Sequence, residues 1–287
     1  MVALKLMVAG DKSSAGKSTV SLGLLAALLE AGFQPSELAY IKPATQCVSS
    51  TLTARFCEDR GIAYEHIGPV VFYRGYTREM IDKQKGPDTS GALVNECAEA
   101  VARISEGKRL TVIDGVGYPS VGSIVTCSSA DIAVACVAPV LLVGKSGVGD
   151  AVDSFNLCAR YFEAQRVPVL GGIFNKLSPT GFYSLEKCRD YVSKYMRWAR
   201  PRQKVYGMLP SHDALGALGA DEACGFAFSR PEKLPSAGPM TEQDQKAVQV
   251  LAELFSEHVN VKQLVSDVEQ ASARPSDWVT ELPQFPQ

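Results

Sequence analysis

The stretch Gly10-Asp11-Lys12-Ser13-Ser14-Ala15-Gly16-Lys17-Ser18-Thr19 lies between two segments of different character. The apolar run before it, Ala3 to Ala9, predicts a buried strand, and the segment after it predicts a helix from Lys17 to Ala31, closed by Gly32. Between a strand and a helix, the backbone N–H groups of such a loop converge with the unpaired donors of the helix N-terminus. We therefore expect these ten residues to bind the phosphates of ATP.

Two side chains of this loop complete a nucleotide site. Lys17 supplies a positive charge near the outer phosphates, and Ser18 supplies a hydroxyl oxygen that is a suitable ligand for Mg²⁺. A glycine-serine turn with incidental lysines is the alternative interpretation, but the strand before the loop and the helix after it favour phosphate binding. We expect Lys17 to be catalytic and both ATP and Mg²⁺ to be cofactors.

The spacing of the loop departs from the standard form. Five residues separate Gly10 from Gly16, and Asp11 stands where the first glycine of the standard loop would be. Lys12, five positions before Lys17, resembles the signature lysine of deviant Walker A proteins, which reaches the phosphates of a partner subunit. This resemblance implies a homodimer with a catalytic role for Lys12, whereas a solvated lysine in a turn is the alternative.

The rest of the chain predicts an α/β protein with a mostly parallel central sheet flanked by helices, the P-loop NTPase fold. Short runs rich in Val, Ile and Leu alternate with longer segments as far as about Met208. Further strands are expected at Leu38–Ile41, Pro69–Phe72, Leu110–Asp114, Val140–Gly144, Val169–Phe174 and Val205–Met208. Further helices are expected at Ser90–Ser105, Ser129–Ala138 with Ser129 as the cap, Ala151–Gln165 and Thr241–His258.

The domain organisation follows from the same alternation. Residues 1–228 are expected to form the ATP-binding, ligase-like domain, and residues 229–287 to add a proline-containing loop, a helix and a tail that pack on the same domain. No internal repeat divides the chain, so we expect a single unit.

Composition limits the classes of partner. The 287 residues are 46% hydrophobic, and 29 basic against 31 acidic residues give a net charge of −2, so nucleic acid is not an expected partner. The longest apolar run, Ile132 to Val143, is shorter than the roughly 20 residues of a membrane span, so no membrane is expected either. Eight cysteines without a C-x-x-C pair exclude zinc-finger spacing and are interpreted as mostly buried thiols of a reducing, cytoplasmic compartment.

Three polar residues follow predicted strands at the carboxyl edge of the sheet. Asp114 is placed to meet Mg²⁺, directly or through water, although an acid that merely ends a strand is the alternative. Lys42 is placed to face substrate anions or the transferred phosphoryl group, and its alternative is a solvated loop residue. Asn175 offers a paired donor and acceptor to the edge of adenine, or it stabilises a turn.

Four further segments occur in a fixed order after the loop: Tyr40–Pro43, Val112–Gly117, Pro139–Val143 and Gly171–Lys176. With the loop, they resemble dethiobiotin synthetase and its relatives, including the amidating enzymes of cobalamin synthesis, over about residues 1–212. The resemblance implies an ATP- and Mg²⁺-dependent ligase with a small-molecule substrate. It also implies site residues, with Pro210 near the base, Gln46 at a substrate position, and Gly147 and Gly149 in the substrate wall.

The sequence departs from this family at contacts to metal and substrate. Ser13 and Ser14 replace a threonine-glutamate pair, Gln46 replaces a serine, and the segment Ser49–Thr53 lacks an aspartate that serves as a metal ligand. The cluster Arg74, Thr77 and Arg78 is interpreted either as a carboxylate site or as a solvated basic face.

Three functions therefore remain open. One is a ligase that forms a cyclic urea from a diamine and CO₂, or activates a related carboxylate or amine. The second is a nucleotide-switched dimeric ATPase of the partition or metal-delivery type, which Lys12 favours. The third is a nucleotide-binding relative without ligase activity, which the replaced metal contacts favour.

Overall fold

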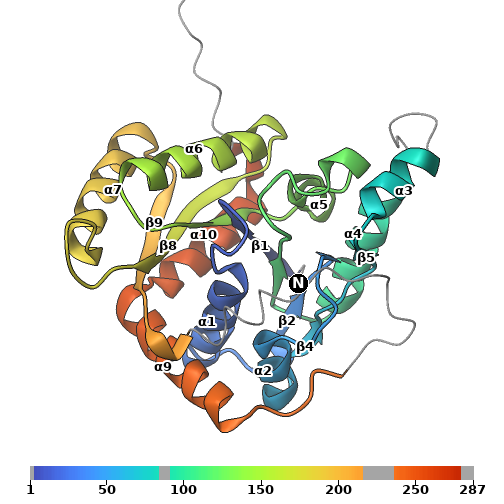
Figure 1. The fold of residues 1–287 in the computed structure, drawn as a ribbon, viewed down its shortest axis with the longest axis horizontal. Coiled ribbons are helices and arrows are strands. Elements are labelled where there is room, and N and C mark those ends of the chain that lie inside the picture. The colour runs from blue at the N-terminus through green and yellow to red at the C-terminus, as the bar shows by residue number, and fades with distance from the viewer. Residues whose placement is uncertain (1–2, 84–90, 216–235, 279–287) are drawn as a thin grey trace, which may run out of the picture.

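A seven-stranded sheet forms the centre of the computed structural model, which describes residues 3–83, 91–215 and 236–278 (Figure 1). Its strand order is β4-β2-β6-β1-β7-β8-β9, and every neighbouring pair is parallel. The strands are β1 (Leu4–Gly10), β2 (Leu38–Ile41), β4 (Ala63–Glu65), β6 (Leu110–Asp114), β7 (Val140–Gly144), β8 (Val169–Leu177) and β9 (Lys204–Pro210). The predicted α/β fold with a mostly parallel central sheet is confirmed.

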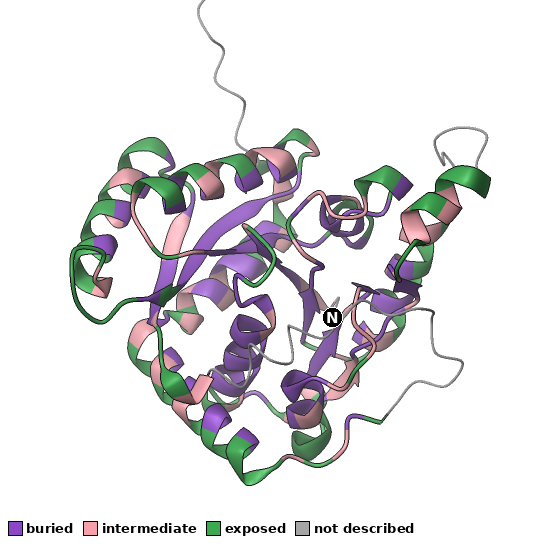
Figure 2. Cartoon of the chain, in the orientation of Figure 1, coloured by how far each residue is buried: buried purple, intermediate pink, exposed green. Residues whose placement is uncertain are grey.

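Helices cover both faces of this sheet, which is why its strands are nearly continuous apolar runs (Figure 2). Side chains of β1 alternate between two hydrophobic cores: Leu6 and Val8 belong to one, and Met7 and Ala9 to the other. The first core is closed by α1 (Lys17–Glu30), α2 (Leu52–Arg60), α9 (Glu242–His258) and α10 (Val261–Ala273). The second is closed by α4 (Ala92–Ser105), α5 (Ser129–Cys136), α6 (Gly149–Ala164) and α7 (Leu185–Ala199).

The strand order places a crevice at the carboxyl end of β1. The chain leaves β1 for β2 on one side of the sheet and, after β6, crosses to β7 on the other side. Loops on either side of such a switch point run in opposite directions, and ligands of open α/β sheets bind between them. Because Val8 pairs with Asp114 and Ile41 with Ile113, the ends of β1, β2 and β6 lie together at this point.

One predicted strand does not belong to the central sheet. Of the expected strand Pro69–Phe72, only β5 (Val70–Val71) forms, and it pairs with β3 (Ala44–Thr45) in a separate two-stranded sheet. The edge of the main sheet is instead β4, whose three residues are all half-buried. Its sequence Ala-Tyr-Glu lacks the apolar run of a strand covered on both faces, so its pattern gave no signal.

Several helices were not predicted, and one cap was misplaced. The missed helices are α2, α3 (Tyr76–Lys83), α7 and α10, and short 3-10 turns lie at Pro35–Glu37, Ser123–Val125, Asp213–Leu215 and Pro275–Trp278. Ser128, not Ser129, caps α5, because its hydroxyl accepts from the Asp131 backbone N–H while the Asp131 carboxylate accepts from the Ser128 backbone N–H. The expected helix start at Ser90 and the 228/229 boundary lie outside the described residues.

The prediction of buried thiols is confirmed for six cysteines, while Cys224 lies outside the described residues. Six cysteines are buried and free, namely Cys57, Cys97, Cys127, Cys136, Cys158 and Cys188. Cys47 differs, because it is disulfide-bonded. Within the described ranges, no helix has the length and apolar character needed to cross a bilayer.

The packing of α9 on α1 gives a test of this architecture. Gly23 of α1 approaches the Phe255 ring so closely that an added Cβ would lie 2.1 Å from it, and the Phe255 side chain is fully buried. Phe255→Ala should lower the free energy of unfolding by about 3–5 kcal/mol, as measured by urea denaturation. The exposed neighbour Ser256→Ala is the control, with an expected change within about 0.5 kcal/mol. A loss under about 1 kcal/mol for Phe255→Ala would contradict this packing.

Candidate active site

Two glycines shape the loop between β1 and α1. Gly16 has φ +90°, in the left-handed region, and a Cβ there would lie 2.2 Å from Nδ2 of Asn175, so conformation and space both require glycine. At Gly10, a Cβ would lie 3.0 Å from Cγ of Lys17, because the aliphatic part of Lys17 folds back over the end of β1. The Lys17 side chain is thereby held along the loop, and only 8% of the residue is exposed.

The N-terminus of α1 is prepared for an external anion. The first N–H groups of a helix have no intrahelical acceptor, and side chains or ligands must satisfy them. Side chains do so at the starts of α5 and α9, through the capping boxes of Ser128 and Thr241. At α1 the capping residue is Gly16, no side chain caps the helix, and the first turn carries no acidic residue, so the positive end of the helix dipole suits an anionic ligand.

Asp11 holds the first part of the loop in place. Its backbone N–H donates to the carbonyl of Val143 at 3.0 Å, and its Oδ2 accepts from the backbone N–H of Lys145 at 3.1 Å. Burial raises the pKa of this carboxyl group above its ordinary value. Asp11 is thus joined to the β7–α6 connection, and this explains how an acid is accommodated in a phosphate-binding loop.

Asn175 and Lys176, at the end of β8, hold the second part of the loop. Nδ2 of Asn175 donates to the carbonyl of Ala15 at 3.1 Å, its Oδ1 accepts from the backbone N–H of Lys176, and Nζ of Lys176 donates to the carbonyl of Ser14 at 2.8 Å. Pro210 ends β9 and pairs with Leu177, two residues after Asn175. Asn175 therefore supports the loop, and adenine contacts by Asn175 and Pro210 stay predictions.

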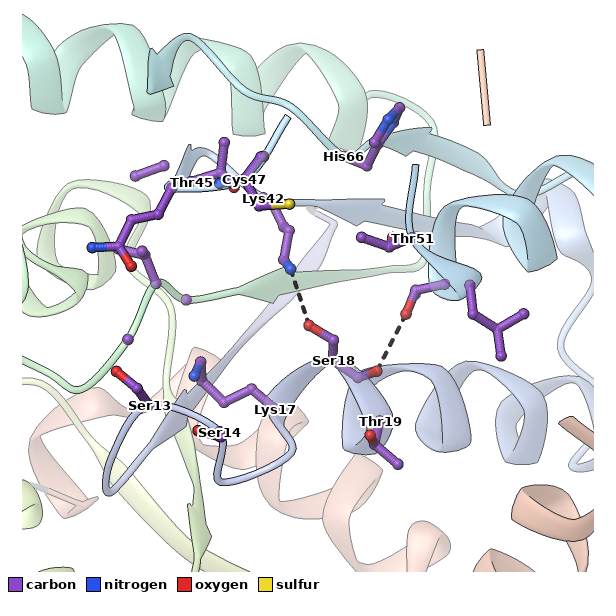
Figure 3. A pocket seen from close by; sticks show the side chains of 17 residues that line it. Ser13, Ser14, Lys17, Ser18, Thr19, Lys42, Thr45, Cys47, Thr51 and His66 are labelled. Carbon is purple, nitrogen blue, oxygen red and sulfur yellow. Dashed lines mark hydrogen bonds between the residues drawn. The ribbon is translucent and has the colours of Figure 1, made fainter. Parts of the chain in front are cut away.

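The ammonium of Lys42 reaches the hydroxyl of Ser18 beside the loop (Figure 3), and both groups lie next to the carboxylate of Asp114. Oδ2 of the fully buried Asp114 accepts from the hydroxyls of Ser18 and Tyr40, at 2.8 Å each. Nζ of Lys42 donates to Oγ of Ser18 at 3.0 Å and lies 3.3 Å from the same Oδ2. Burial and the neighbouring Asp114 charge raise the pKa of Tyr40 well above its ordinary value, so its hydroxyl remains a donor.

The same group of oxygens fits Mg²⁺. Oδ1 of Asp114 is buried without a hydrogen-bond partner, next to the Ser18 hydroxyl that a P-loop uses as a metal ligand. No cluster of three or more His, Cys, Asp or Glu residues that suits a metal occurs in the described part of the chain. Mg²⁺ typically takes one or two protein ligands and completes its shell with phosphates and water, so this pair is sufficient.

A cavity of about 280 Å³ opens from these residues. Seven of the predicted site residues line it: Ser13, Ser14, Lys17, Ser18, Thr19, Lys42 and Gln46. Gly115, Val116 and Gly117 also line it and belong to the segment Val112–Gly117 that carries the resemblance, whereas sequence reasoning missed the other lining residues: Ala44, Thr45, Cys47, Thr51, Leu52, Thr53 and His66. The predicted Gly147 and Gly149 are not in this lining, and neither are Arg74, Thr77 and Arg78.

The missed residues come mainly from the start of α2 and from the ends of strands. Thr51 caps α2 by accepting from the backbone N–H of Ala54, and Thr53 donates to the carbonyl of Ser18 at 3.3 Å. The hydroxyl-rich run before α2 was noticed only for the acid that it lacks, although a threonine before a helix is a signal for a cap. Gly149 begins α6, and Gly147 lies in the loop before it with φ +116°, so their role in the substrate wall stays a prediction.

Residues 4–218 match a protein family described as an AAA domain. The chain belongs to this family. The family includes dethiobiotin synthetases, which confirms the resemblance read from the sequence, and together with the fold it makes the chain a P-loop nucleotide-binding protein.

Two curated relatives show the same relationship at low identity. ATP-dependent dethiobiotin synthetase from Anaeromyxobacter sp. (strain K) is 26% identical over 189 residues, which are 61% of this chain and 77% of that protein. Cobyrinate a,c-diamide synthase from Methanosarcina barkeri is 39% identical over 59 residues, 19% of this chain, and the match spans only 11% of that enzyme.

Solved structures are similar only at a general level. A putative plasmid partition protein from Borrelia burgdorferi bound to AMPPNP has a TM-score of 0.45 at 13% identity, covering 90% of this chain and 99% of that one. MinD from Aquifex aeolicus has a TM-score of 0.43, also at 13% identity, covering 88% of this chain and 98% of that one. Likeness at this level does not bear on function.

Substitution of Gly16 tests the loop geometry. Gly16→Ala should weaken ATP binding at least about tenfold, because the added Cβ displaces Asn175 and strains the loop. Gly32→Ala is a matched control, since Gly32 has a similar φ of +95° but nothing within 4 Å of an added Cβ. Calorimetric titration with ATP and Mg²⁺ measures both variants. Equal affinities in the two would contradict the assigned geometry.

Proposed function

We propose that this protein is an ATP- and Mg²⁺-dependent ligase of the dethiobiotin synthetase type, acting on a small molecule with a carboxylate or carbamate to be activated. The observation that supports it is the cavity of about 280 Å³ beside the phosphate loop, with Lys42 from β2 reaching the Ser18–Asp114 pair. A nucleotide switch needs only the loop, whereas a ligase also needs room for a second substrate next to the terminal phosphate.

Each group of site residues has a separate role in such a reaction. Loop amides and the α1 N-terminus would hold the phosphates, and Lys17 would neutralise their charge. Ser18 and Asp114 would hold Mg²⁺, which would offset charge on the phosphate oxygens. An oxygen of the substrate attacks the γ-phosphorus, and the bond from that phosphorus to the bridging oxygen breaks as ADP leaves. An amine then attacks the activated carbon, and inorganic phosphate leaves as the amine loses a proton.

The charge of the cavity favours an acidic substrate. The cations in its lining are Lys17 and Lys42, and no Asp or Glu occurs among the described residues that line it. Burial, assisted by the nearby Lys42 charge, lowers the pKa of His66 below its ordinary value, so this imidazole is neutral at pH 7 and contributes no charge. A carboxylate or bicarbonate therefore meets no repulsion from acidic side chains in this lining.

The alternative function is a nucleotide-switched dimeric ATPase, and one observation favours it. Lys12 is exposed within the phosphate loop, five residues before the buried Lys17. An exposed lysine at that position is able to reach the nucleotide of a second subunit in a homodimer. In this alternative, the product of ATP binding is a conformational state rather than a new chemical bond.

Removal of the Lys17 ammonium should abolish ATP turnover. Lys17→Ala should lower kcat/KM by at least about a hundredfold, because the charge developing on the transferred phosphoryl group is no longer offset. Lys145→Ala is the matched control. The ammonium that it removes pairs with Asp150, and the backbone N–H of residue 145, which supports Asp11, is kept. Turnover of Lys17→Ala equal to that of the control would reject the assignment of the loop.

Dependence on a second substrate separates the two functions. Phosphate release from ATP should rise at least about tenfold with a suitable acid and amine, and bicarbonate with diaminopelargonate is the first mixture to test. Turnover that ignores small molecules but rises with protein concentration would instead support the switch. In that case Lys12→Ala should impair dimerisation measured by sedimentation, whereas an unchanged dimer would remove the role of Lys12.

A further inference from the structure

The ammonium of Lys42 occupies a position that a metal ion would require. It donates to Oγ of Ser18 at 3.0 Å and lies 3.3 Å from Oδ2 of Asp114. These are atoms of the same two residues that fit Mg²⁺. In Figure 3 the Lys42 side chain points from its strand end to the Ser18 hydroxyl, so its charged end lies beside one of the two residues that fit Mg²⁺.

Binding of a metal at the hydroxyl of Ser18 would place two cations side by side. The hydroxyl donates its one proton to Asp114, one oxygen lone pair accepts from Lys42, and a metal would use the other. A divalent cation bound at this oxygen would face the ammonium at about 3–4 Å, a separation at which like charges repel strongly near a protein interior. This repulsion favours departure of one of the two cations.

We propose that Lys42 is the resident cation of the Ser18–Asp114 pair, that the incoming divalent metal displaces it, and that only the displaced ammonium binds the anionic substrate. This inference rests on the proposed function and adds an order of binding to it. The metal with its nucleotide binds first and releases Lys42, and the acid binds second.

The surroundings of Lys42 favour this order. While paired, its side chain is 17% exposed and its charge is compensated by Asp114, so it offers little attraction to a substrate anion. Once it is displaced, no Asp or Glu among the described lining residues is available to compensate the charge again. An acid in the cavity then supplies the missing countercharge, and substrate affinity depends on the metal.

The first test measures metal affinity with Mn²⁺ as the probe, using full-length protein saturated with ADP and electron paramagnetic resonance to count free Mn²⁺. Lys42→Met keeps the length and removes the charge, so it should bind Mn²⁺ at least about fivefold more tightly than the unmodified protein. Lys145 is paired with Asp150, and the control variant Lys145→Met should change the Mn²⁺ affinity less than about twofold. Lys42→Gln serves as a second variant, with thermal melting as the check on folding.

The second test detects the movement itself. Acetic anhydride labels amines, and mass spectrometry reports the labelling of each lysine in the unmodified protein. Labelling of Lys42 should rise at least about threefold when Mg²⁺ is added to the ADP complex, while labelling of Lys145 stays constant.

The outcomes separate this inference from the function on which it rests. Weaker or unchanged Mn²⁺ affinity in both Lys42 variants would overturn the inference, because a lysine that merely positions Ser18 would weaken metal binding when removed. Tighter affinity without a change in Lys42 labelling would also overturn it, since that indicates repulsion without displacement. Failure of the unmodified protein to bind Mn²⁺ with ADP would instead refute the proposed function.

Discussion

The buried carboxylate of Asp114 is the constraint on which the arrangement of the site depends. A carboxylate that is fully removed from water must keep donors or a cation beside it. Here Ser18 from α1 and Tyr40 and Lys42 from the end of β2 meet at its Oδ2. One charge thereby fixes the relative positions of β6, α1 and β2, and it brings the phosphate loop next to the only lysine that enters the described cavity lining from outside that loop.

The phosphate loop depends on a second set of supports from the other half of the sheet. Asp11 is held by the β7–α6 connection, and the carbonyls of Ser14 and Ala15 are held by Lys176 and Asn175 from β8. These contacts leave the N-terminus of α1 free of capping side chains without leaving the loop unsupported. The loop is therefore held in place before a ligand arrives, which lowers the cost of ordering it on binding.

Local patterns in the sequence were enough to predict the phosphate loop and every strand of the central sheet except β4. A buried strand, a glycine at positive φ and a helix start each leave a signal over a few neighbouring residues. The acid at the end of β6 was found for the same reason. Tertiary features were not predictable in this way. The cap at Thr51 lines the cavity only because α2 packs against α1, and β4 is a strand only because β2 offers an open edge. Likewise, nothing in the sequence near Asn175 indicates that its amide meets the carbonyl of Ala15, 160 residues away.

The departures from dethiobiotin synthetases change the charge balance around the Asp114 carboxylate. Those enzymes carry a glutamate in the loop and an aspartate after the second strand, whereas this chain has Ser14 at the first position and only hydroxyl residues at Ser49–Thr53. With fewer acids, the negative charge at the metal position comes from Asp114 among the residues that the structure describes there. A single negative charge compensates either the Lys42 ammonium or part of the charge of Mg²⁺, but not both at once. Competition between the two cations is therefore expected to be stronger here than in a relative with additional carboxylates, because those acids would allow lysine and metal to be compensated together.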